Sequence, residues 1–72
     1  MTREEHLEWA KARALEYVDM DDLPQAFASL TSDLSKHEQL EDHPAIHLGM
    51  GMMMLGHLDT SEKMRRFILG CH

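Results

Sequence analysis

The sequence predicts an all-α fold, a compact bundle of four short helices that forms a single domain over residues 1–72. Apolar residues recur at three- and four-residue intervals in four separate segments, which is the periodicity of amphipathic helices. Strand-forming residues are scarce, with one valine and two isoleucines in the whole chain. A chain of this length buries only about 60% of its unfolded surface, so one domain without a large catalytic cleft is expected.

The first helix is predicted from Thr2 to Val18. Thr2 and Glu5 have the spacing of a capping box, in which a hydroxyl and a carboxylate satisfy the backbone N–H groups at a helix start. Leu7, Ala10 and Ala14 then follow one another at helical spacing and define the inner face.

The second helix is predicted from Leu23 to Lys36. Asp22 can cap its first turn, and Pro24 comes early enough that its missing N–H has little effect. Leu30 belongs to the inner stripe, whereas Asp33 is expected on the outside. The short acidic turn before this helix predicts that the first two helices form a hairpin.

The third helix is predicted from Pro44 to Gly56 and is expected to be the hub of the fold. Its middle, residues 49–55, reads GMGMMML and is apolar on every side, so it needs cover all round. Methionine fills irregular core gaps and also makes adaptable binding surfaces. Some of Met50, Met52, Met53 and Met54 can therefore lie at the surface and mate with another chain, and a homodimer satisfies both interpretations.

The fourth helix is predicted from Thr60 to Gly70, with Met64, Phe67 and Ile68 on its inner face. The basic residues of this helix, Lys63, Arg65 and Arg66, are expected to face water.

Charge is unevenly distributed along the chain, whose formal net charge is -6. Residues 1–42 hold eleven carboxylates and four Lys or Arg, whereas residues 43–72 hold two and three. Such a field repels nucleic acid and can speed the capture of a partner protein with a basic surface. The alternative is a solvated acidic face that serves solubility. The residues predicted to contact the partner are Glu4, Glu5, Glu8, Trp9, Asp19, Asp21 and Asp22.

Two histidines, His43 and His47, are the candidates for a metal site. They stand four residues apart, which brings two imidazoles onto one helical face where zinc or another transition metal can bridge them. The alternative is that both are ordinary surface or capping histidines, since no cofactor is required by any other pattern. The single cysteine, Cys71, cannot form an internal disulfide, which favours a reducing compartment.

Several function classes are not expected. No catalytic set is recognisable, because a cysteine next to the C-terminus is poorly placed for a rigid nucleophile, so the protein is not expected to be an enzyme. The longest apolar stretch, residues 44–58, is shorter than the roughly 20 residues that cross a bilayer. The charged first residues lack the apolar region of a secretory signal, so a cytoplasmic location is expected.

Two segments, ARALEYVDMDDLPQAFASLTSDL and HPAIHLGMGMMMLGHLDT, the latter continuing to MRRFILG, resemble small uncharacterised helical proteins encoded by bacteriophages and other mobile elements of bacteria. The resemblance implies an accessory protein in the cytoplasm of the host bacterium that binds, and can inhibit, a host protein. The leading hypothesis is therefore a non-enzymatic module that docks its acidic helical face onto a host protein. A metal-stabilised module and a structural homodimer are the alternatives.

Overall fold

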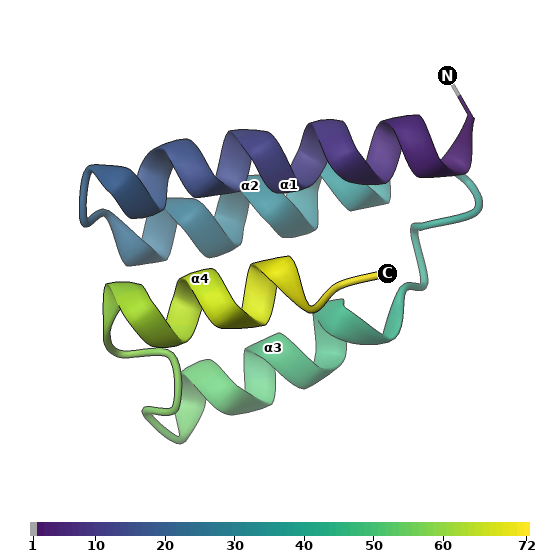
Figure 1. The fold of residues 1–72 in the computed structure, drawn as a ribbon. Helices are drawn as coiled ribbons and strands as arrows, with labels where there is room; N and C mark the ends of the chain where they lie inside the picture. Colours follow the sequence, from purple (N-terminus) through teal and green to yellow (C-terminus); the bar gives the residue numbers. More distant parts are fainter. Residues whose placement is uncertain (1) are drawn as a thin grey trace.

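The computed structural model describes residues 2–72, and within this range the chain forms four α-helices joined by short connections (Figure 1). The helices are α1 (Arg3–Asp19), α2 (Leu23–Ser35), α3 (Pro44–Met54) and α4 (Ser61–Leu69). No strand occurs between residues 2 and 72. The predicted all-α class is confirmed, and each predicted helix end lies within two residues of the observed one.

Each helix begins at a side chain that accepts a hydrogen bond from the first turn. Thr2 and Glu5 form the predicted capping box, with both N···O distances near 3 Å (3.1 and 3.0 Å). Asp22 caps α2 and Thr60 caps α4. His43 caps α3 through its ring nitrogen Nδ1. Local capping chemistry therefore sets all four helix starts.

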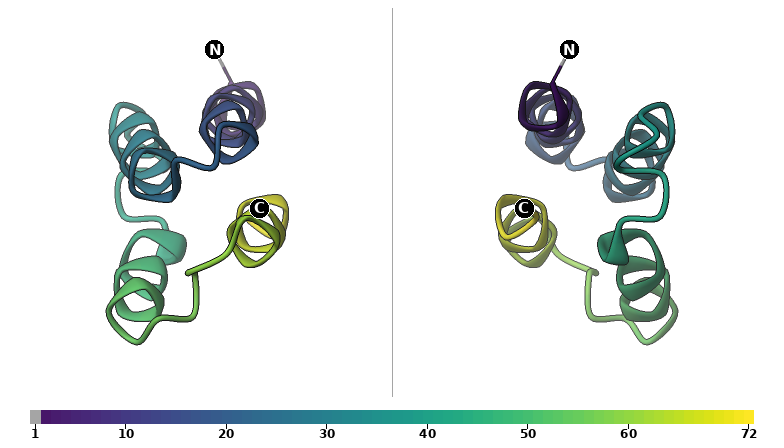
Figure 2. Two further views of the ribbon diagram at one scale, coloured as in Figure 1. Left: turned by 90° about the vertical axis from the view of Figure 1, so that its left-hand side faces the viewer. Right: turned by 90° about the vertical axis from the view of Figure 1, so that its right-hand side faces the viewer.

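The helices α1 and α2 form a closely packed antiparallel hairpin, and α4 packs against both of them (Figure 1). The helix α3 runs antiparallel to α4 but contacts it only loosely. Viewed along the helices, α4 lies below α1 and α3 lies below α2, so that α1 and α3 are diagonally opposite (Figure 2). The radius of gyration is 11.1 Å, close to the value of about 11 Å expected for a compact chain of this length.

The hydrophobic core lies between α1, α2 and α4. The small residues Ala10 and Ala14 of α1 are fully buried, which lets the neighbouring helices approach closely. Leu40 and Leu58, from the connections before and after α3, close the core at its ends. The largest fully buried apolar side chains are Val18, Leu30, Leu34, Leu40, Met64 and Ile68.

The prediction that the third helix is the buried hub is wrong. Only Ala45 and Gly49 of α3 are buried. Leu48 is 60% exposed, Met50 51% and Met54 87%, and the C-capping residue Leu55 is 74% exposed. Three other helices of this size form a core among themselves and do not supply enough surface to surround a fourth. The helix therefore lies at the edge of the bundle.

Gly49 is the point where α3 seats against the core. The rings of Phe27 from α2 and Phe67 from α4 lie 6.5 Å apart, centroid to centroid, and face this glycine. A Cβ atom at position 49 would overlap the Phe27 ring and lie 2.9 Å from Cζ of Phe67. Glycine is required here because the two aromatic rings contact the helix backbone directly.

Candidate functional site

The solvent face of α1 carries a row of carboxylates. Glu4, Glu8 and Glu16 are exposed, and their spacing in steps of four residues, with Ala12 completing the row, places them along a line that winds about 120° around the helix. Glu4 has a long contact with Arg3 (3.8 Å), and Glu8 has one of 3.7 Å with Lys11. Ion pairs that are exposed and this long contribute little free energy, so these carboxylates are available to a partner. We call Glu4, Glu8 and Glu16 the acidic stripe.

The predicted contact residues in the turn between α1 and α2 have internal partners instead. Asp19 accepts a hydrogen bond of 2.7 Å from the guanidinium of Arg65 in α4. Asp21, whose backbone φ is 58°, accepts a hydrogen bond from the Ser61 hydroxyl at the start of α4. Asp19 and Asp21 therefore connect the end of the first hairpin to α4, and Asp22 caps α2.

Glu5 is also engaged within the fold. It accepts a hydrogen bond from the backbone N–H of Thr2, and the Thr2 backbone and side chain both hold the pKa of Glu5 below its ordinary value. Of the six acidic residues predicted to contact a partner, only Glu4 and Glu8 therefore lack a capping or junction role. Glu16, another exposed acidic residue of α1, also lacks such a role and joins them.

Trp9 is half-buried and packs against the core. The guanidinium carbon of Arg13 lies 5.0 Å from the centroid of its ring system, and the Lys36 ammonium lies 5.9 Å away. The His6 ring packs beside it with a centroid distance of 5.1 Å. The indole is thus enclosed by cationic and aromatic neighbours rather than presented as a free hot spot.

A buried carboxylate, Asp33, organises this region, and the prediction that it lies outside is wrong. Asp33 is 1% exposed and accepts 3.0 Å and 3.1 Å contacts from Arg13 and Lys36, with a longer hydrogen bond from Ser29. Its backbone carbonyl accepts a hydrogen bond from Nε2 of His6. Asp33 stands three residues after Leu30 on the inner stripe, and this position was the signal for its burial.

The histidine pair is split between two environments. His43 is largely buried, and Nδ1 accepts from the backbone N–H of Ala45 while Nε2 donates to the backbone carbonyl of His72 at 3.0 Å. His47 is exposed on α3. Among residues 2–72, no cluster of three or more histidine, cysteine or acidic side chains is arranged to hold a metal ion. Metal binding by this pair stays a prediction, and it requires breaking one of the His43 hydrogen bonds.

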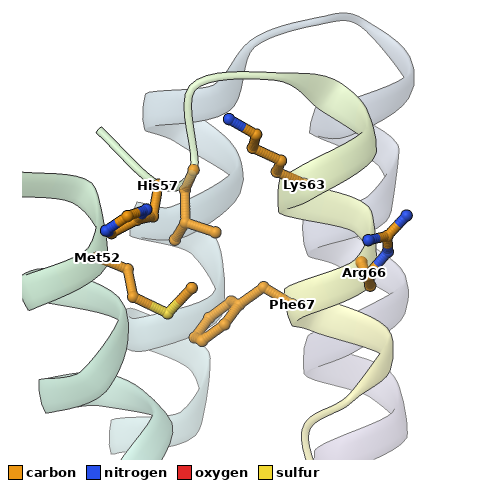
Figure 3. A pocket seen from close by; sticks show the side chains of 6 residues that line it. Met52, His57, Lys63, Arg66 and Phe67 are labelled. Atoms are coloured by element: carbon orange, nitrogen blue, oxygen red, sulfur yellow. The ribbon is translucent and has the colours of Figure 1, made fainter. Parts of the chain in front are cut away.

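A groove runs between α3 and α4. Met52 reaches from α3 toward the ring of Phe67 on α4, and together they form its apolar floor (Figure 3). One end of the groove, beside Leu48, encloses about 440 Å³, and the other end, beside His57, about 320 Å³. The cationic rim is neutralised by nearby carboxylates, because Arg66 pairs with Glu62 of α4 at 2.8 Å and Lys63 pairs at 3.0 Å with Asp59, which lies just before α4.

The outer side of α3 is apolar and open to solvent. We define the α3 face as His47, Leu48, Met50, Gly51, Met54 and Leu55, all of which are exposed. Residues 43–58 contain no Asp, Glu, Lys or Arg. The molecule therefore has two contrasting surfaces, the acidic stripe on α1 and the uncharged α3 face on the diagonally opposite helix (Figure 2).

The only cysteine of the sequence, Cys71, is buried. Cys71 is 5% exposed, and its thiol lies 3.5 Å from the carbonyl of Phe67. Burial raises the pKa of this thiol, although the nearby Lys11 ammonium opposes the shift. A raised pKa disfavours the thiolate, which is the nucleophilic form.

No protein-family model, curated protein or solved structure matches this chain. In the part of the chain that the structure describes, none of the helices is both long enough and apolar enough to cross a bilayer.

Proposed function

We propose that this protein is a non-enzymatic interaction module that docks the acidic stripe of α1 onto a basic surface of another protein. The observation that carries the proposal is the exposure of Glu4, Glu8 and Glu16 along one helix, while Asp19, Asp21 and other acids are held by internal partners. The stripe is the set of carboxylates on α1 that has neither a capping role nor a contact with α4.

Electrostatics supports this mode of binding. The charge of -7 on residues 1–42 produces a directional field, because residues 43–72 carry only +1. A field of this kind accelerates encounter with a basic surface and weakens as salt screens it over about 10 Å at 0.1 M ionic strength. The resemblance to phage-encoded proteins suggests a host protein as the partner, and a host surface that receives nucleic acid has the complementary charge. Occupation of that surface would inhibit its owner.

Charge reversal of the acidic stripe tests this proposal. The variant Glu4→Lys, Glu8→Lys and Glu16→Lys changes the charge by +6 without touching the capping residues Glu5 and Asp22. Its matched control reverses three exposed acids of the α2–α3 connection, namely Glu38, Glu41 and Asp42.

Both variants should remain helical by circular dichroism. Proteins captured by the wild-type chain from host lysate are identified by mass spectrometry and then measured in purified form. We expect the stripe variant to lower the association rate constant at least about tenfold at low salt, and the control to lower it much less. Equal losses in the two variants, or no loss in either, would contradict a docking role for the acidic stripe.

A further inference from the structure

The α3 face is large for so small a molecule. Leu48, Met50, Met54 and Leu55 are each exposed by half or more, and together they present about 500 Å² of apolar surface. The largest apolar patch on an ordinary monomer covers about 300–600 Å², so this one lies near the top of that range on a chain of only 72 residues. The largest apolar patch of a monomer is often functional, so the α3 face is a candidate for a surface that another molecule covers.

Gly51 lies at the centre of this face and has no explanation within the described fold. At 100° per residue, His47, Gly51 and Met54 follow the middle of the outer side of α3. A Cβ atom at Gly51 would meet no described atom within 4 Å, in contrast to Gly49, where the aromatic rings exclude one. A glycine inside a helix lowers its stability, and close approach of another helix is the structural reason for keeping one.

The absence of charge on the α3 face bears on which molecule can pack against it. The α3 face offers no ionic group to select a partner of either sign, since residues 43–58 lack Asp, Glu, Lys and Arg. Two copies that meet through α3 bring together uncharged surfaces from the half of the chain that carries +1. Their acidic α1 helices lie on the diagonally opposite side of each copy (Figure 2). Repulsion between the two acidic stripes is therefore smaller in this arrangement than in one that brings the α1 helices together.

We propose that the α3 face pairs with the same face of a second copy, with a twofold axis close to Gly51. In such a dimer both copies use the same surface patch, and each contact occurs twice. Met54 of one α3 therefore packs near Leu48 or His47 of the other. Two faces of this size bury about 1,000 Å² in total, which is about the minimum expected of a biological interface. The groove floor formed by Met52 and Phe67 adjoins Leu48 and extends the apolar contact. A dimer with a dissociation constant in the micromolar range is expected.

This inference goes beyond the proposed function and does not depend on it. The dimer leaves both acidic stripes exposed at its far ends, so it would be bivalent toward a basic partner. Dimerisation is measured on the purified chain alone, whereas docking is measured with a captured partner. Failure of one proposal is therefore distinguishable from failure of the other.

Sedimentation of the full chain from low micromolar to near-millimolar concentration tests the proposal. Met54→Glu places a carboxylate in each half of the interface, and the matched control Met20→Glu makes the same change at an exposed site at the end of α1. A second variant, Gly51→Leu, fills the position at the axis with a residue of higher helix propensity, so it disturbs pairing without weakening α3.

We expect the wild-type chain and Met20→Glu to reach a plateau at the mass of a dimer. Met54→Glu and Gly51→Leu should raise the dissociation constant at least about tenfold while their circular dichroism spectra remain helical. A wild-type chain that stays monomeric throughout overturns the proposal and leaves the α3 face to a partner of other chemistry. Association that continues past the dimer, or that survives both α3 variants, assigns the contact to a different surface and overturns it as well.

Discussion

Gly49 and Gly51 allow the seating of α3 to be tested with one substitution, glycine to alanine, at two positions on opposite sides of the helix. At Gly49 the added methyl group would overlap the ring of Phe27 and crowd that of Phe67. At Gly51 it would meet none of the atoms of residues 2–72 within 4 Å. The two variants share the same change in helix propensity, so the difference between them isolates packing.

The expected free-energy changes have opposite signs. Alanine raises helix stability by about 0.5–1 kcal/mol relative to glycine, and Gly51→Ala should gain that amount. Overpacking of a well-filled site costs about 1–3 kcal/mol, and the upper part of that range applies at Gly49 because two rings must shift. Subtracting the gain in propensity leaves a loss of about 1–2 kcal/mol for Gly49→Ala. In a domain of this size, the melting temperature changes by about 4–8 °C per kcal/mol.

Urea unfolding followed by circular dichroism measures both free energies. The protein is kept at a concentration where sedimentation shows a monomer, because Gly51 lies at the centre of the proposed dimer contact. Gly49→Ala should unfold at lower urea than the wild-type chain and Gly51→Ala at higher urea. A Gly49→Ala variant as stable as Gly51→Ala would refute the conclusion that Phe27 and Phe67 contact the helix backbone.

Two further predictions concern buried polar groups. Asp33→Ala should lower the free energy of unfolding by about 1–3 kcal/mol, because it removes the buried acceptor of Arg13 and Lys36. The control Asp59→Ala, which removes an exposed ion pair, should leave the urea midpoint almost unchanged. Equal shifts of the urea midpoint in the two variants would contradict the role assigned to Asp33. The Cys71 thiol should react with a disulfide reagent at pH 8 at least about tenfold more slowly in the folded chain than in urea, because burial protects it and raises its pKa. When the pH rises above 9.0, the ordinary pKa of a cysteine thiol, the unfolded chain loses the Cys71 proton before the folded chain does, so the free energy of unfolding should fall. Cys71→Ala should weaken this pH dependence. An identical pH profile in the variant would contradict the raised pKa of Cys71.

The helix boundaries were predictable because their causes are local. A capping side chain and the backbone N–H that donates to it lie within three residues of each other, as Thr2 and Glu5 or Asp22 and Gln25 show. Capping residues and helical periodicity are both visible in a short window of sequence, which is why the predicted and observed ends agree within two residues.

The position of α3 was not predictable from its own composition. A helix that is apolar on all sides needs cover, but its sequence does not say whether its own chain or another molecule provides it. The answer depends on how much surface the other helices offer to α3. The small buried residues Ala10, Ala14 and Ala26 let α1 and α2 pack closely against each other and leave no surface wide enough to surround α3. The glycine at position 49 is explained by the close approach of two aromatic side chains, which only the folded structure shows.

The acidic pattern identified part of the candidate site and could not identify the rest. The four-residue spacing of Glu4 and Glu8 follows from sequence alone. The Asp19 pairing spans 46 residues to Arg65, and such a contact exists only once α4 lies beside α1. Asp33 was misplaced for a related reason, because an aspartate on the inner stripe is acceptable only when a cation such as Arg13 reaches it from the neighbouring helix.

The two proposed surfaces follow from one property of a small helical chain. Three helices suffice to build the core, so the fourth contributes one side to it and leaves the other side uncovered. If that uncovered side carried charges, the chain would remain monomeric without further contacts, but residues 43–58 carry none. A water-exposed face without charge is stable in solution when an identical face covers it, and the -7 of residues 1–42 then keeps the dimer soluble. In the proposed dimer the acidic half and the apolar helix would have complementary roles, because the charge of the first would oppose association of the second beyond a pair.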